Sequence, residues 1–196
     1  MKRTAKESRR TAETAIEVEL DLDGAGRAEI RTGIGFFDHM LTLFARHGLF
    51  DLTVAARGDL EVDGHHLVED VGIVLGRALR RALGEARGIS RYGWALVPMD
   101  EALAQVAVDL GGRSYLAYEV EVAESRLGDF DPALGREFMR ALAENAGCNL
   151  HVRLLSGGNG HHCLEACFKA LARALRAAVA LDPRETGVPS TKGVIE

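Results

Sequence analysis

The sequence predicts an α+β fold built from two similar halves, each combining a sheet with helices. Strand-like and helix-like segments alternate along the 196 residues without the regular strand–helix rhythm of a parallel sheet. The sequence also repeats itself, because the run His-His-Leu-Val-Glu at residues 65–69 returns as His-His-Cys-Leu-Glu at residues 161–165. A repeated unit that ends in the same helix indicates two pseudo-symmetric halves around one core.

The repeat extends beyond this histidine motif. Residues 75–82 match residues 171–178 at six of eight positions. An upstream alignment makes His39 the counterpart of Glu137, after which both halves read helix, strand, loop and helix. We therefore expect one compact domain made of two fused half-repeats, residues 1–88 and residues 89–196.

The first half should contain a hairpin followed by two helices that flank a strand. Apolar and acidic residues alternate from Ile16 to Leu22, which is typical of a half-buried strand, and a glycine-rich turn at residues 23–26 leads to a second strand through Ala28 and Ile30. The later elements expected are a helix over residues 36–46, a strand over residues 50–56 and the motif helix over residues 65–85.

The second half should place three strands before its first helix. That helix begins near Asp131-Pro132, and the tail after Asp182-Pro183 is expected to be irregular because glycine and proline punctuate it. The expected strands cover residues 94–98, 103–110, 115–122 and 149–155, and the last helix covers residues 161–180.

Each copy of the histidine motif is predicted to serve two metal ions. On a helix, positions i and i+4 share a face, whereas adjacent positions point about 100° apart. His65 can therefore bind one ion together with Glu69, while His66 points elsewhere, and the second copy repeats this pattern with His161, His162 and Glu165. Imidazole and carboxylate without a matching cysteine suit a divalent ion such as Mn, Zn, Fe or Ni.

Composition excludes several classes of protein. The net charge of −5, with no basic run interleaved with aromatic residues, argues against nucleic acid or an anionic membrane as the partner, so a small molecule is expected. No signal-like segment and no window of about 18 apolar residues occurs, which predicts a cytoplasmic protein. The three cysteines are expected to be reduced and buried: Cys148, Cys163 and Cys167.

Several further groups have two interpretations each. Asp38 either orients the ring of His39 or caps the helix that begins there. The glycine-rich run at residues 156–160 either lets a ligand approach the metal or simply turns a strand into a helix. Asp100-Glu101 is expected to be a turn. A last group of residues either holds an anionic group or consists of solvated loop side chains: Arg91, Arg113, Ser190 and Lys192.

Four segments together resemble one known family, the imidazoleglycerol-phosphate dehydratases of histidine biosynthesis. The resemblance covers nearly the whole chain and is carried by residues 36–41, 63–70, 161–170 and 189–193. It implies two repeats, each with a mostly antiparallel four-stranded sheet packed with helices in a ribosomal S5 domain 2-like fold. It also implies a manganese-dependent hydro-lyase with two Mn²⁺ per active site, assembled as a homo-oligomer of 24 subunits with sites between neighbouring subunits.

The resemblance also assigns roles to individual positions. The implied metal ligands are His39, His65, His66, Glu69, Glu137, His161, His162 and Glu165. Where the family commonly has a further histidine ligand, this chain has Glu137, whose carboxylate either binds the metal or does not. The implied catalytic carboxylates are Glu13, Glu69 and Glu165. The implied substrate contacts are Glu13, Arg91, Arg113, Ser190 and Lys192.

The implied reaction is the dehydration of D-erythro-imidazoleglycerol phosphate to imidazoleacetol phosphate, with Glu13 a candidate for proton transfer. Two other classes use similar ligands. One is a two-metal phosphoester hydrolase, although such sites rely on bridging aspartates and none falls within the repeated motif. The other is a non-catalytic shell whose subunits are held together by metal.

Overall fold

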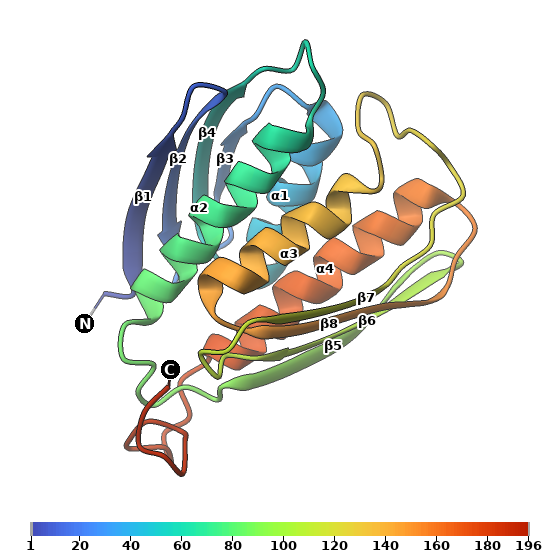
Figure 1. The fold of residues 1–196 in the computed structure, drawn as a ribbon. Coiled ribbons are helices and arrows are strands. Elements are labelled where there is room, and N and C mark those ends of the chain that lie inside the picture. Colours follow the sequence, from blue (N-terminus) through green and yellow to red (C-terminus); the bar gives the residue numbers. More distant parts are fainter. Residues whose placement is uncertain (1, 196) are drawn as a thin grey trace.

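A computed structural model describes residues 2–195, in which two sheets enclose four helices (Figure 1). The helices lie between the sheets, so the layers are the first sheet, helices α1 and α2, helices α3 and α4, and the second sheet. The bounds of the helices are α1 (Gly35–Gly48), α2 (His65–Leu83), α3 (Leu134–Ala146) and α4 (Gly160–Val179). The predicted α+β class and the two repeats are confirmed.

The first sheet comes entirely from the N-terminal part of the chain. Its strand order is β1-β2-β4-β3, and its pairings are antiparallel except for the parallel pair β3 and β4. The strands are β1 (Thr4–Arg10), β2 (Thr14–Asp21), β3 (Ala28–Arg31) and β4 (Asp51–Gly58).

The second sheet repeats this topology with strand order β5-β6-β8-β7, and again only its last pair is parallel. Its strands are β5 (Tyr92–Met99), β6 (Ala102–Asp109), β7 (Tyr115–Glu119) and β8 (Asn149–Ser156). The identical order of the two sheets, each mostly antiparallel, confirms the duplication predicted from the sequence.

The predicted hairpin between residues 16–22 and 28–30 is wrong. β2 pairs instead with β1, a strand that the sequence analysis missed, and β3 lies at the far edge of the sheet against β4. The seven residues of β1 include only one apolar side chain, Ala5, and alternate between exposed and half-buried positions. An edge strand with so few apolar residues has no alternation signal to detect.

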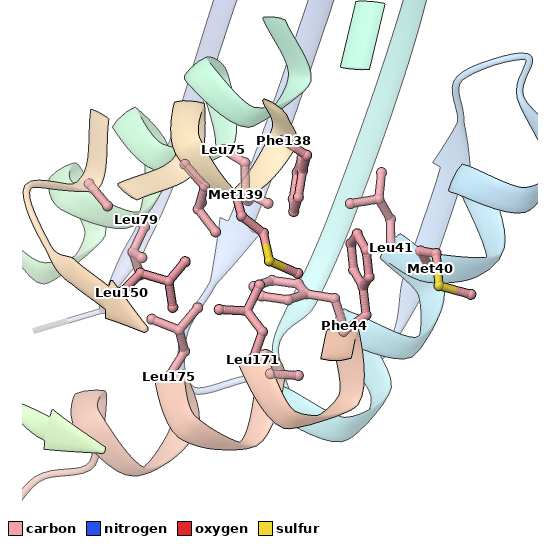
Figure 2. Packing of buried hydrophobic residues seen from close by; sticks show 14 of the residues in the cluster. Met40, Leu41, Phe44, Leu75, Leu79, Phe138, Met139, Leu150, Leu171 and Leu175 are labelled. Atoms are coloured by element: carbon pink, nitrogen blue, oxygen red, sulfur yellow. The ribbon is translucent and has the colours of Figure 1, made fainter. Parts of the chain in front are cut away.

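The core lies between the sheets and is continuous from one half to the other. Phe44 of α1, Leu75 of α2, Phe138 of α3 and Leu171 of α4 are all buried and lie together in Figure 2. Because these side chains come from all four helices, neither half has a closed core of its own.

Helix pairing crosses between the halves. α1 packs against α4, and α2 packs against α3. Gly72 and Gly76 lie where α2 meets α3, and a Cβ on either would stand 2.7 Å from a carbonyl oxygen of α3. This crossing brings the start of each motif helix beside a helix from the other half, which positions the candidate site.

Candidate metal centres

The first cluster joins His39 of α1 to His161 and Glu165 of α4. The Nε2 atoms of both histidines lie 3.1 Å from the same carboxylate oxygen, Oε2 of Glu165. Ligands about 2.2 Å from one ion and at right angles to each other lie about 3.1 Å apart, so this spacing suits a shared divalent ion. His39 and Glu165 are 126 residues apart in the sequence, and only the packing of α1 on α4 brings them together.

The second cluster stands at the equivalent place between α2 and α3. Ligand atoms of His65, Glu69 and Glu137 lie within 4.8 Å of one another. His65 and Glu69 correspond to His161 and Glu165, and Glu137 stands where His39 stands in the first cluster. The geometry therefore suits Glu137 as a ligand, and it makes this cluster richer in carboxylate.

A cation holds the carboxylates of each cluster, and neither cation was predicted from the sequence. Nζ of Lys169 lies 2.5 Å from Oε1 of Glu165, the oxygen that does not face the histidines. In the second cluster, Nη2 of Arg140 lies 2.6 Å from Glu69 and 2.9 Å from Glu137. Each cation holds one oxygen of a carboxylate and leaves the other free to face a metal, a supporting role that is common around metal ligands.

These contacts shift the pKa values of the carboxyl and guanidinium groups. Burial disfavours the charged form of Glu165, but the hydrogen bonds from Lys169, His39 and His161 outweigh burial and hold its pKa at about 2. The hydrogen bond to Glu137 is the main reason that the pKa of Arg140 is raised. The Glu165 carboxyl is therefore ionised at neutral pH, as a metal ligand must be.

The second histidine of each motif faces a separate group of acids, as the helical spacing requires. Nδ1 of His66 donates a hydrogen bond to Asp59 at 3.0 Å, and Oε2 of Glu13 lies 3.9 Å away. Nδ1 of His162 donates to Glu101 at 2.9 Å. These hydrogen bonds raise the pKa of both histidines, and the bond from His162 is the main cause that lowers the pKa of Glu101 to about 2.

The structure bears on three of the expectations drawn from the sequence. Asp38 accepts hydrogen bonds from the backbone N–H and the hydroxyl of Thr32, so it orders the loop before α1. Both interpretations of Asp38 are wrong, because no side chain caps the start of α1 and no hydrogen bond joins Asp38 to the His39 ring within residues 2–195. Asp100-Glu101 does form a turn between β5 and β6, but Glu101 also holds His162. The run at residues 156–160 is a strand-to-helix turn, in which the side chain of Asn159 caps α4.

The candidate phosphate-binding residues lie together but far from the clusters. Arg91, Arg113, Ser190 and Lys192 line a cavity of about 250 Å³. The backbone N–H of Arg91 donates to Ala178 near the end of α4, whereas His161 stands at its start. At 1.5 Å per residue the two ends of this helix are roughly 25 Å apart. Figure 1 shows the C-terminal tail beside the last turns of α4, at the end opposite to its first turn.

The cysteines lie apart from this chemistry. Cys148, Cys163 and Cys167 are free and buried, as predicted. Burial raises the pKa of Cys148 and Cys167 to about 12, so neither thiol ionises readily to the thiolate form that binds metal.

Fold and clusters define a class of protein, a duplicated α+β protein with matched histidine–carboxylate clusters where its halves meet. The family model described as imidazoleglycerol-phosphate dehydratase matches residues 32–175. The imidazoleglycerol-phosphate dehydratase of Trichlorobacter lovleyi is 58% identical over 195 residues, covering 100% of both chains. That of Moorella thermoacetica is 57% identical over 195 residues with the same coverage.

Solved structures agree with this match. The crystal structure of imidazoleglycerol-phosphate dehydratase from Staphylococcus aureus superposes with a TM-score of 0.83 at 38% identity, covering 91% of this chain and 99% of that chain. The Pyrococcus furiosus structure gives a TM-score of 0.80 at 41% identity, covering 95% and 99%. The chain belongs to the imidazoleglycerol-phosphate dehydratase family and is a hydro-lyase of histidine biosynthesis. Within residues 2–195, no helix is both long enough and apolar enough to cross a membrane.

Proposed function

We propose that the protein dehydrates D-erythro-imidazoleglycerol phosphate to imidazoleacetol phosphate in a metal-dependent reaction, with two Mn²⁺ ions per active site. The observation that carries this proposal is the pair of equivalent clusters, each with imidazole and carboxylate donors converging from two helices. The donor set of nitrogen and oxygen, without thiolate, suits manganese.

Each ion would be held by one cluster and completed from a neighbouring subunit. His39, His161 and Glu165 would bind one ion, and the other would be bound by the second cluster, His65, Glu69 and Glu137. His66 and His162 face away from both clusters of their own chain. They are therefore available as ligands to the ions of adjacent subunits.

The same reasoning supports a homo-oligomer. One chain places the phosphate-binding candidates and the metal clusters at opposite ends of α4, too far apart to hold one small substrate. A second copy that brings its Arg91 end to the cluster of the first would complete the site. The resemblance to the family suggests that 24 subunits assemble in this way.

The chain's own residues would bind the substrate and move its proton. Divalent ions bound at the ring would favour its deprotonated imidazolate form, whose electron density would weaken the bond between the adjacent carbon and the departing hydroxyl. Glu13, whose carboxylate is exposed beside His66, would accept the side-chain proton, and the enol left after loss of water would tautomerise to the ketone. Glu69 and Glu165 would act through the metals. Arg91, Arg113, Ser190 and Lys192 would hold the phosphate away from the reacting carbons.

One assay tests this function against its alternatives. Metal-free protein is incubated with imidazoleglycerol phosphate, with and without Mn²⁺. Manganese-dependent formation of imidazoleacetol phosphate is the expected result. Release of free phosphate would indicate a phosphoester hydrolase, and no reaction with metal bound would indicate a metal-assembled shell. Full activity in exhaustively metal-free protein would refute the metal-dependent mechanism.

A further inference from the structure

Glu13 and Glu101 occupy equivalent places in the two sheets. Glu13 immediately precedes β2 in the turn from β1, and Glu101 immediately precedes β6 in the turn from β5. Both turns stand beside the second histidine of the motif in their own half, His66 or His162. Each half therefore places a glutamate of equivalent position beside the second histidine of its motif.

Glu101 is fully occupied in holding His162. One of its oxygens accepts the Nδ1–H of His162 at 2.9 Å, and the other accepts the backbone N–H of Asn159 at 2.8 Å. With Nδ1 occupied as a donor, Nε2 is the nitrogen of His162 left to bind a metal. A carboxylate held by contacts on both oxygens is poorly suited to accept a substrate proton.

Glu13 makes no such contacts. Its nearest oxygen lies 3.9 Å from Nδ1 of His66, beyond hydrogen-bond distance, and 57% of its side chain is exposed. Within residues 2–195 no hydrogen bond engages its carboxylate. Glu13 therefore has a free carboxylate, whereas both oxygens of its counterpart Glu101 accept hydrogen bonds.

Asp59 accepts the hydrogen bond from Nδ1 of His66, as Glu101 does from Nδ1 of His162. Its Oδ2 accepts the Nδ1–H of His66 at 3.0 Å, and its side chain is only 18% exposed. The other oxygen, Oδ1, is buried and has no partner in the described part of the chain, so the hydrogen bond to His66 is its single engagement. Asp59 directly follows β4, and the residue that directly follows β8 is Gly157, which has no side chain to offer.

We infer that Asp59 is the positioning residue for His66, presenting Nε2 of that ring for metal binding, and that it thereby releases Glu13 for proton transfer. The second part of the inference rests on the proposed function, because it assigns Glu13 to the proton transfer of that reaction. The first part concerns metal binding and can be measured without substrate.

Manganese binding to the intact oligomer tests the role of Asp59. Asp59→Gly copies the second half at this place and should weaken Mn²⁺ binding about 10- to 100-fold, measured by calorimetric titration of metal-free protein. Asp59→Asn keeps an oxygen that can accept the hydrogen bond, so its loss should be smaller. Glu61→Gln removes one negative charge from the same loop and is the matched control. Affinity of both Asp59 variants equal to that of the control would overturn the proposal.

A double-mutant cycle tests the release of Glu13. Glu13→Gln alone should leave Mn²⁺ affinity unchanged, because Asp59 still holds His66. In the Asp59→Gly background Glu13 is the carboxylate nearest to His66, so the same change should weaken binding several-fold further. Equal losses from Glu13→Gln and Asp59→Gly as single variants would show that Glu13 holds the ring, and the inference would be wrong. Since no substrate is used, failure of the dehydratase assay would leave this test intact.

Discussion

The cluster between α2 and α3 contains two carboxylates and one imidazole, whereas the cluster between α1 and α4 contains one carboxylate and two imidazoles. The supporting cations differ too, because Arg140 comes from α3 and Lys169 from α4, positions that the repeat does not relate. The two halves place their donor atoms equivalently, but the clusters differ in charge and in the cation that holds their carboxylates. Equivalent geometry therefore does not make the two clusters chemically equal.

The two halves also differ in the side chains buried beneath the turns that carry Glu13 and Glu101, which are polar in the first half and apolar in the second. In the first half, buried Asp70 of α2 contacts Arg9 at 2.8 Å and accepts a hydrogen bond from Thr14. The hydroxyl of Thr11, bonded to that of Thr14, accepts the backbone N–H of Glu13. The corresponding positions of the second half hold only apolar side chains, Val97, Ala102 and Ala166.

The largest effect on activity should come from removing a carboxylate from either cluster, if the two clusters act together in one reaction. Glu165→Gln and Glu69→Gln should each reduce kcat by at least about 100-fold, because each would remove a charged ligand from a different ion and the proposed reaction uses both ions. Steady-state kinetics with saturating Mn²⁺, together with the bound metal measured per subunit, checks this. A variant that loses one ion but keeps full turnover would show that its cluster is not part of the active site.

The buried polar group of the first half predicts the largest effect on stability. Asp70→Ala should lower the free energy of unfolding by about 3 kcal/mol, because Arg9 and Thr14 lose their shared partner. The triple variant Arg9→Val, Thr14→Ala, Asp70→Ala copies the second half and should recover much of this loss, since apolar packing replaces all three groups. Urea unfolding at fixed protein concentration measures both. A triple variant less stable than Asp70→Ala would contradict the comparison.

Gly76 allows α2 to lie close against α3. Gly76→Ala would place a Cβ 2.7 Å from the carbonyl oxygen of Leu142, so α2 must shift on α3. We expect a destabilisation of about 2 kcal/mol, the size typical of overpacking. The aligned position in α4, Ala172, already carries a buried side chain. Ala172→Gly is the matched control and should lose about 1 kcal/mol through helix propensity, together with the packing of one buried methyl group, both measured by urea unfolding. No destabilisation by Gly76→Ala would show that the close contact is unimportant.

The smallest effect should come from making the two clusters alike. Glu137→His gives the carboxylate-rich cluster the donor set of the other one. Because imidazole suits zinc better than manganese, competition between Zn²⁺ and Mn²⁺ should shift towards zinc by about tenfold, with little change in fold stability. Equilibrium dialysis against both ions measures the ratio. No shift would indicate that Glu137 is not a ligand, whatever its position.

The sequence by itself predicted most of the fold and two of the three residues of each cluster. Helical spacing alone places His65 with Glu69 and turns His66 away, and the aligned repeat makes His39 and Glu137 counterparts. Strong periodicity made the long helices and central strands predictable, whereas β1, an edge strand with a single apolar residue, produced no signal and the hairpin was assigned wrongly. The division near residue 88 stays a prediction.

The supporting residues were invisible in the sequence. Asp59, Arg140 and Lys169 each look like an ordinary charged residue, because their function depends on contacts made across the packed molecule or on a neighbouring turn of helix. Local patterns predicted which residues share a helix face as candidate ligands, since helical spacing is a property of the nearby chain. The pairing of α1 with α4 and α2 with α3 was decided only by tertiary packing, since burying four apolar helix faces in one core brings donors from opposite halves together.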